Sequence, residues 1–326
     1  MAKHTSIPTR KLGRSDVDFT VLTFGCWQAG GKQWTDTNDE DSLQAMRAAY
    51  ECGITSYDTA EAYGGGHSEE IVGKFIKEIG RDNLTIATKV GAGSLAADKL
   101  NKSCDESLSR LGIDKIDLYQ IHWPSGTWGG DKVPLEETMT ALVKLQESGK
   151  IGAIGVSNFG KDLIQEALQY GRIDSLQPPY SLFFQPYVAN GTIDFCLENE
   201  IGVIPYSPLA QGLVTGKFNM NNRPTDNREG NHLFKDPAYG IALQATDKLK
   251  PIAEKYNANT AQIALAWLIA QPGVTSPIVG ARNARQIEDT AQAASITLKP
   301  EDVEAVSQVA QPVLDAVPDE KTNPWG

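Results

Sequence analysis

Short apolar runs alternate with longer amphipathic segments along nearly the whole chain. Eight of these runs have the length and composition of buried β-strands. They cover residues 21–25, 55–60, 84–90, 116–122, 153–159, 175–180, 202–209 and 276–281. Between them, apolar residues at helical spacing predict helices, for example over 39–53, 68–80, 135–150 and 283–294. The second of these helices would begin with Ser68 as its N-cap and end at Gly80.

Eight strand–helix units in 326 residues predict an α/β fold of the (β/α)8 TIM-barrel type. The competing architecture is a doubly wound sheet, but no GxGxxG motif follows an early strand and no GxxxxGK[ST] motif occurs. We therefore expect one domain over 1–326, with a core of about 10–310 and a flexible tail over 311–326. Residues 7–20 precede the first strand and would form a hairpin that caps the bottom of the barrel.

Two further segments stand out from the alternating pattern. Residues 217–240 form a long polar insertion after the seventh strand, and long loops without secondary structure are often functional lids. The longest apolar run, 263–270, is too short to span a bilayer. We expect the first segment to be a lid and the second to be a buried helix.

Composition narrows the class of partner. The net charge of −11 argues against nucleic acid, because phosphate binding needs clustered Lys and Arg. The four cysteines form no CxxC pair, which is typical of reduced thiols, and the four histidines are too scattered to predict a metal site. The N-terminus has no apolar signal segment. We expect a soluble, cytoplasmic protein with no membrane partner, and a monomer because no extended apolar surface helix stands out.

Polar residues end several predicted strands. Asp58, Lys89 and His122 end the second, third and fourth strands and are 31 and 33 residues apart. Each alone has an ordinary interpretation: a helix cap, a solvated charge and a hydrogen-bonded core residue. In a barrel, however, the carboxyl ends of the strands meet at one mouth, so the three side chains should converge. Tyr63 lies in the loop directly above Asp58.

These four residues make chemical sense as one proton-transfer site. A free tyrosine has a pKa of about 10 and is a poor acid at neutral pH. A nearby ammonium such as Lys89 would lower that pKa, and the Asp58 carboxylate would keep the ammonium charged. His122 could share the proton or orient a carbonyl. We therefore predict that Tyr63 donates a proton to a developing alkoxide, although these residues supply no electrons.

Several motifs resemble those of the aldo-keto reductases. They are DTAEAYGGGHSEEIVGK around Tyr63, TKV around Lys89, DLYQIHWP around His122, IGAIGVSNF, QPPYSLF, IPYSPLAQGLVTGK and PIVGARNARQIEDT. The resemblance extends from about Arg10 to Glu304 and is strongest to bacterial members near the potassium-channel β-subunit branch. It implies NADPH-dependent reduction of small aldehydes and ketones to alcohols.

The resemblance also implies residue roles. Tyr63 would be the general acid, Lys89 would lower its pKa, Asp58 would pair with Lys89, and His122 would position the carbonyl oxygen. The substrate would contact Tyr63 and His122 and lie near Trp27. Independently of the resemblance, Trp27 and Trp123 lie in the loops after the first and fourth predicted strands, where they would either pack on the barrel rim or line an aromatic substrate pocket. The residues implied to contact NADPH or NADP+ are Gly25, Cys26, Trp27, Asp58, Ser157, Asn158, Gln177, Tyr206, Ser207, Pro208, Leu209, Gln211, Gly212, Lys217, Gly280, Arg282, Gln286, Asp289 and Thr290.

Within that set, the roles differ along the cofactor. Ser157, Asn158 and Gln177 would hold the nicotinamide carboxamide, and Tyr206 would stack on the ring. Arg282 would grip the 2′-phosphate, since a planar guanidinium suits a dianionic phosphate and favours NADPH over NADH. Thr290 stands where many members have Asn, which weakens the adenine contacts.

Two other functions remain open from the residues alone. A Schiff-base lyase would use Lys89 as a nucleophile, which needs a lowered pKa, whereas Asp58 would raise it. A regulatory subunit would keep the barrel and sense the cofactor with little turnover.

Overall fold

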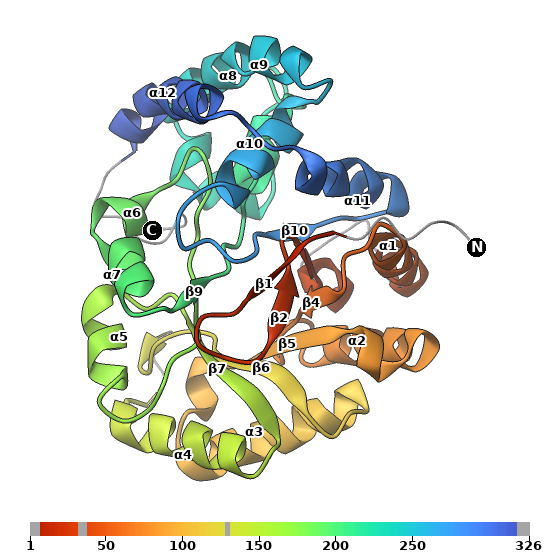
Figure 1. Cartoon of the computed structure of the whole chain (residues 1–326), viewed down its shortest axis with the longest axis vertical. Helices are drawn as coiled ribbons and strands as arrows, with labels where there is room; N and C mark the ends of the chain where they lie inside the picture. Colours follow the sequence, from red (N-terminus) through yellow and green to blue (C-terminus); the bar gives the residue numbers. More distant parts are fainter. Residues whose placement is uncertain (1–6, 32–37, 128–130, 318–326) are drawn as a thin grey trace.

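In the computed structural model, which describes residues 7–31, 38–127 and 131–317, a sheet of eight parallel strands curls into a barrel (Figure 1). Its order is β10-β3-β4-β5-β6-β7-β8-β9. The strands are β3 (Thr23–Gly25), β4 (Ser56–Asp58), β5 (Thr85–Val90), β6 (Ile116–Ile121), β7 (Ile151–Ser157), β8 (Ser175–Gln177), β9 (Gly202–Val203) and β10 (Ile278–Gly280). The bridge Val203–Val274 and the 2.8 Å bond from Ile278 N to Pro205 O close the ring. The predicted (β/α)8 barrel is therefore confirmed.

The seventh strand of the ring is much shorter than the sequence predicts. The apolar run suggested 202–209, but β9 covers Gly202–Val203. Pro205 follows and has no N–H for a ladder bond. Ser207 then adopts φ 52°, in the left-handed region that ends extended structure. The chain beyond β9 is thus irregular where it approaches the functional cleft.

Helices pack around the outside of the barrel (Figure 1). They are α1 (Asp39–Glu51), α2 (His67–Ile79), α3 (Ala97–Leu111), α4 (Leu135–Glu147), α5 (Lys161–Ala167), α6 (Pro186–Ala189), α7 (Thr192–Glu198), α8 (Ala238–Lys248), α9 (Lys250–Lys255), α10 (Thr260–Ile269), α11 (Ala284–Ala291) and α12 (Pro300–Ala316). The buried helix expected at 263–270 is confirmed as α10, and Gly80 caps the end of α2 as predicted. None of the helices in the described ranges is long and apolar enough to cross a membrane.

The start of α2 differs from the prediction. Its N-cap is Gly66, with φ 97°, and Ser68 lies within the first turn. Ser68 is buried, and its hydroxyl donates to the carbonyl oxygen of Cys26 at 2.7 Å and accepts from Thr59 at 2.8 Å. The side chain is used to join the loops after β3 and β4, so it is not available as a cap.

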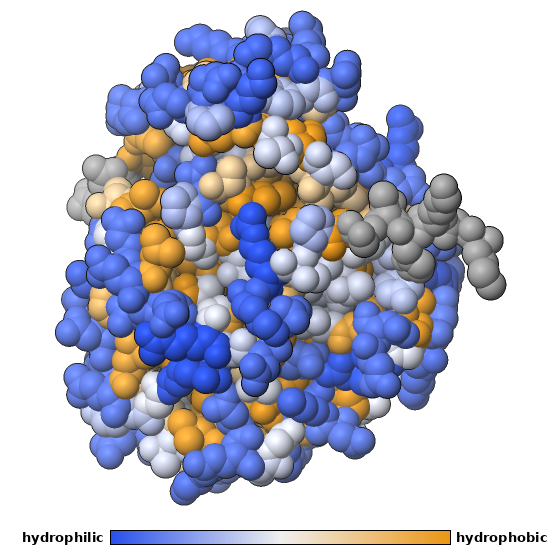
Figure 2. Space-filling model, in the orientation of Figure 1, coloured by the Kyte–Doolittle hydropathy of each residue, from blue (hydrophilic) through white to orange (hydrophobic). Residues whose placement is uncertain are grey.

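An N-terminal hairpin closes the bottom of the barrel, as predicted. Strands β1 (Thr9–Lys11) and β2 (Asp18–Thr20) pair antiparallel. Between and beside them, Leu12 and Phe19 are fully buried and form a cluster with the lowest inward-facing residues, Ala87, Leu118, Ala153 and Ile204. The outer face of the hairpin is hydrophilic and covers the centre of the view in Figure 2. The barrel interior is therefore sealed at this end.

Two predicted irregular segments are more ordered than expected. The insertion 217–240 contains the 3-10 helices η6 (Asn227–Gly230) and η7 (His232–Phe234), and Leu233 and Phe234 are buried. Helix α12 continues to Ala316, so the tail predicted to start at 311 is helical up to that residue. Apolar contacts hold both segments, which a polarity pattern does not reveal. Residues 318–326 of the predicted tail lie outside the described residues.

Candidate active site

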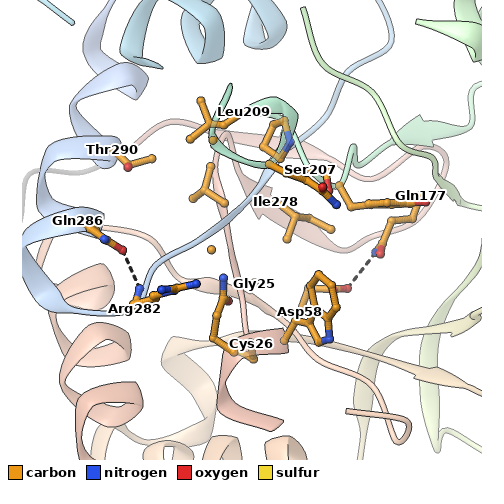
Figure 3. A pocket seen from close by; sticks show the side chains of 18 of the residues that line it. Gly25, Cys26, Asp58, Gln177, Ser207, Leu209, Ile278, Arg282, Gln286 and Thr290 are labelled. Atoms are coloured by element: carbon orange, nitrogen blue, oxygen red, sulfur yellow. Dashed lines mark hydrogen bonds between the residues drawn. The ribbon is translucent and has the colours of Figure 1, made fainter. Parts of the chain in front are cut away.

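A cleft of about 1010 Å³ opens at the carboxyl ends of the barrel strands (Figure 3). Every residue predicted to contact cofactor or substrate lines it. Of the four predicted catalytic residues, Asp58, Tyr63 and His122 line the cleft, whereas Lys89 is fully buried behind it. The fold thus brings the predicted catalytic, cofactor-binding and substrate-binding residues together at one cleft.

Lys89 connects the buried and exposed parts of this site. Its ammonium donates to Asp58 Oδ1 at 2.5 Å and to the carbonyl oxygen of Thr59 at 2.7 Å. It also lies 3.2 Å from the Tyr63 hydroxyl. Burial lowers the pKa of Lys89, but the charge of Asp58 and the Tyr63 hydroxyl raise it, and the net direction is upward. The lysine is therefore held as a charged ammonium.

The pKa of Tyr63 departs from the expectation. Burial raises it, the Lys89 ammonium lowers it, and burial outweighs the ammonium. The predicted net lowering is therefore not found in this structure. The hydroxyl stays protonated through neutral pH.

His122 sits against the other side of the tyrosine. Its ring centroid lies 5.5 Å from that of Tyr63, edge to face. Burial and the nearby Lys89 charge lower the pKa of His122 to about 3. The imidazole is neutral at working pH, so it can orient a carbonyl oxygen but does not carry a proton as a cation. Of the two roles left open by the sequence, orientation is the one that fits.

Two glycines determine where the Tyr63 loop lies. Gly64 has φ 68°, and a Cβ there would lie 2.3 Å from the carbonyl oxygen of Gly30. A Cβ on Gly30 would in turn lie 2.8 Å from the backbone carbon of Tyr63. The backbones of the two loops are thus in direct contact. Trp27, in the loop after β3, lies with its ring centroid 6.3 Å from that of Tyr63.

The predicted nicotinamide end is a hydrogen-bonded layer. Asn158, with φ 62°, donates to the His122 carbonyl and to Ser157 Oγ, both at 3.0 Å, and accepts from the Tyr206 hydroxyl at 2.9 Å. The Gln177 side chain donates to Asp58 Oδ2 at 2.9 Å. These groups are therefore held in one orientation.

Three cations gather at the opposite end of the cleft. The positive charges of Arg228 and Arg282 lower the pKa of Lys217, after the larger effect of burial. Gly212 makes room for Lys217, because a Cβ there would lie 2.8 Å from its Nζ. Arg228 is paired with Asp226 at 2.5 Å. Such a cluster is suited to phosphate groups.

The predicted adenosine end is partly occupied by internal bonds. The Arg282 N–H donates to Gln286 at 2.9 Å, as Figure 3 shows. The Asp289 carboxylate accepts from Asn259 at 2.9 Å and from Gln262 at 3.1 Å. Asp289 thus lines the cleft with its oxygens already bonded to α10 and the residue before it.

Sequence reasoning missed several lining residues. They are Gln28, Ala62, Thr215, Arg228, Asn259, Ala261, Ile278 and Val279. Arg228 had a signal, because it is a basic residue in the segment predicted as a lid. The others are neutral residues whose position depends on the packing of distant segments. Gln120, which also bonds to Asp58, was missed for the same reason.

A sequence model described as the Aldo/keto reductase family matches residues 21–311. Aldo-keto reductase YhdN of Bacillus subtilis is 34% identical over 90% of this chain and 91% of its own length. The NADH-specific methylglyoxal reductase of Escherichia coli is 31% identical over 92% and 97%. Among solved structures, a glycerol dehydrogenase from Gluconobacter oxydans has a TM-score of 0.86 at 30% identity over 97% and 99%. An aldo-keto reductase from Klebsiella pneumoniae in complex with NADPH has a TM-score of 0.75 at 26% identity over 97% and 99%.

Proposed function

The chain belongs to the Aldo/keto reductase family, and from this premise we propose that it reduces small aldehydes and ketones to alcohols with NADPH. The observation that carries this proposal is the 3.2 Å contact between Lys89 Nζ and the Tyr63 hydroxyl, in a site where Asp58 holds the lysine. It is the arrangement that a proton donor to an alkoxide needs.

The chain's residues would divide the reaction between them. The neutral His122 orients the carbonyl oxygen of the substrate towards Tyr63. The tyrosine gives its proton to that oxygen as negative charge develops, and the transfer is favourable because an alkoxide is a stronger base than a phenolate. Lys89 then stabilises the phenolate until the proton is replaced. Trp27 and Trp123 provide apolar walls for the carbonyl substrate.

The cleft fits a nicotinamide dinucleotide phosphate. When bound, the reduced nicotinamide supplies the hydride. The amide groups of Asn158 and Gln177 suit its carboxamide, and Lys217, Arg228 and Arg282 suit its phosphates. Three residues along this path, Asn158, Ser207 and Gln211, adopt positive φ although they are not glycines. Strained backbone of this kind concentrates at functional sites.

We favour NADPH over NADH because Arg282 offers a planar cation for the 2′-phosphate. Relatives differ on this point, since one is named NADH-specific and another was solved with NADPH. The pairing of Lys89 with Asp58 counts against a Schiff-base lyase, because the raised pKa of Lys89 keeps its amine protonated and non-nucleophilic.

The test is a cofactor titration followed by turnover. Binding of NADPH and NADH is measured by protein fluorescence, and oxidation of each is then followed with a panel of small aliphatic aldehydes, aromatic aldehydes and ketones. We expect turnover, with NADPH preferred. Tyr63→Phe should bind NADPH normally and lose at least about 100-fold in kcat. Tight NADPH binding with no turnover on any carbonyl would instead indicate the regulatory subunit, and unimpaired reduction by Tyr63→Phe would exclude this mechanism.

A further inference from the structure

We propose that Gln120 is a positioning residue for the reduction, because it fixes both the carboxylate oxygen of Asp58 that does not face Lys89 and the orientation of the Gln177 amide. Gln120 lies on β6, two residues before His122, and is fully buried. It does not line the cleft, so any effect on the reaction must pass through its neighbours. The inference rests on the proposed function and extends it to a residue behind the site.

Gln120 belongs to the layer of inward-facing side chains above the apolar bottom layer. One pleat below it on the same face of β6, Leu118 packs with the hairpin. At the level of Gln120 the interior is polar, with Asp58 from β4, Lys89 from β5 and Gln177 from β8. A polar side chain buried here must be fully bonded to be tolerated, which requires a fixed arrangement.

Neighbouring β7 leaves space for Gln120. A Cβ on Gly155 would lie 2.8 Å from Gln120 Cγ and 2.4 Å from Ser175 Oγ. Any side chain at Gly155 would therefore push Gln120 out of its place. A glycine is therefore needed on β7 at position 155, where the Gln120 side chain packs against the backbone.

The amide of Gln120 makes two directed bonds. Its Nε2 donates to Asp58 Oδ2 at 3.1 Å, on the carboxylate oxygen that does not face Lys89. Its Oε1 accepts from Gln177 Nε2 at 3.2 Å. The second hydrogen of Gln177 Nε2 goes to Asp58 Oδ2 at 2.9 Å. Both donor hydrogens of Gln177 are therefore committed within the protein.

The consequence concerns the other end of Gln177. With its NH2 group held from behind, the residue presents its carbonyl oxygen to the cleft. A carbonyl oxygen accepts from the NH2 group of a nicotinamide carboxamide, whereas a flipped amide would place two N–H groups against it. Without Gln120, Gln177 loses one of the two acceptors that prevent the flip, and Asp58 loses one of its two amide donors.

Three probes separate the nicotinamide contact from the rest of the cleft. NADP+ carries the carboxamide, its 3-acetylpyridine analogue has an acetyl group without N–H donors, and 2′,5′-ADP lacks the nicotinamide half. Dissociation constants are measured by quenching of protein fluorescence, since Trp27 and Trp123 line the cleft. Wild-type protein should bind NADP+ more tightly than the acetylpyridine analogue.

Gln120→Met keeps the size of the side chain and removes both bonds. We expect NADP+ to bind about 3- to 10-fold more weakly, as for a lost hydrogen bond, with 2′,5′-ADP unchanged and little discrimination left against the acetylpyridine analogue. Leu118→Met, on the same face of the same strand, is the matched control and should change none of the three constants. Equal losses for NADP+ and 2′,5′-ADP, or no loss for NADP+, would overturn the role of Gln120.

Gln120→Glu provides a second, independent test on one folded sample. The charged groups that face position 120 are Asp58 from β4 and Lys89 from β5. Two carboxylates at one site cannot both ionise easily, so the introduced glutamic acid stays protonated at low pH. In that state its O–H donates to Asp58 and its carbonyl oxygen accepts from Gln177, as the amide of Gln120 does. NADP+ affinity should match wild type at low pH and fall as pH rises, while 2′,5′-ADP follows the wild type at every pH.

The outcomes are distinguishable. An NADP+ to 2′,5′-ADP affinity ratio that equals wild type throughout the titration of Gln120→Glu overturns the inference, and it decides the matter if Gln120→Met does not fold. If wild-type protein binds 2′,5′-ADP and NADP+ and the Gln120 variants bind both as wild type does, the role of Gln120 is excluded and the proposed function stands. If wild-type protein binds neither probe, both fail.

Discussion

The Nζ atom of Lys89 lies 3.2 Å from the hydroxyl oxygen of Tyr63, yet the pKa of this tyrosine is raised by burial rather than lowered. A raised pKa keeps the phenol protonated over a wide pH range, but it also makes the phenol a weaker acid. It is unfavourable for the reverse reaction, in which the phenolate must accept a proton. With Tyr63 as the proposed proton donor, the protonated state at neutral pH therefore favours reduction over alcohol oxidation.

The first prediction concerns pH. Tyr63 is protonated below its raised pKa, and His122, with a pKa of about 3, is neutral. The value of kcat/KM for reduction should therefore be level between about pH 6 and 9, whereas alcohol oxidation should accelerate with rising pH. His122→Asn, which cannot titrate, should lower the rate without changing the shape of the profile. An inflection near 6.5 that disappears in His122→Asn would contradict the lowered histidine pKa.

The buried ion pair leads to a prediction about stability. Lys89→Met leaves the Asp58 carboxylate buried without its cation and should lower the free energy of unfolding by about 3–5 kcal/mol. Adding Asp58→Asn should recover part of this loss, so that the two effects are not additive. Because the folded pKa of Lys89 is raised, its contribution is complete at neutral pH and is lost only as pH rises through that value. Urea unfolding at pH 7 measures all three variants, and strict additivity would refute the coupling.

Arg282 provides a prediction about cofactor preference. Arg282→Ala should weaken NADPH binding by about 10- to 100-fold, as expected for lost charge-assisted bonds, and should change NADH binding much less. Arg285→Ala is the control, because Arg285 is exposed in the first turn of α11, three residues after Arg282, and does not line the cleft. Fluorescence titration with both cofactors gives the comparison. Equal losses for NADPH and NADH would mean that Arg282 does not contact the 2′-phosphate.

The insertion 217–240 leads to a kinetic prediction. Asn231 is buried, donates to Gln211 Oε1 at 3.1 Å and caps η7 through the Leu233 N–H, so it holds the segment against the cleft wall. Asn231→Ala should speed cofactor release about 3- to 10-fold, the loss of one hydrogen bond, with the single-turnover rate unchanged. Stopped-flow fluorescence measures both, and the exposed Asn221→Ala is the control. An unaltered release rate would exclude the segment as a lid.

The barrel, and the convergence of Asp58, Tyr63, Lys89 and His122 at its mouth, could be predicted because both depend on local, periodic features. Strand and helix lengths follow from the hydrophobic pattern, and Asp58 and Lys89 converge because each ends a strand. The pairing of Gln120 with Asp58 could not be predicted, since it joins residues 62 positions apart through the packing of two non-adjacent strands. The direction of the pKa shift of Tyr63 could not be predicted either, because the burial that raises it depends on the closed barrel. The local pattern also predicts Ser68 as the N-cap of α2, because it does not show that the Ser68 hydroxyl bonds to the carbonyl oxygen of Cys26, 42 residues away.

The contact between Gly30 and Gly64 has a consequence for how the substrate range can change. The loop that carries Trp27 and the loop that carries Tyr63 meet backbone to backbone, so they form one rigid lip of the cleft. Lengthening either loop to admit a larger carbonyl substrate would also displace the Tyr63 hydroxyl, the proposed proton donor. Trp123 stands on the separate loop after β6. Substitutions of Trp123 should therefore widen the substrate range more readily than changes in the two joined loops, where a larger pocket would come with slower reduction.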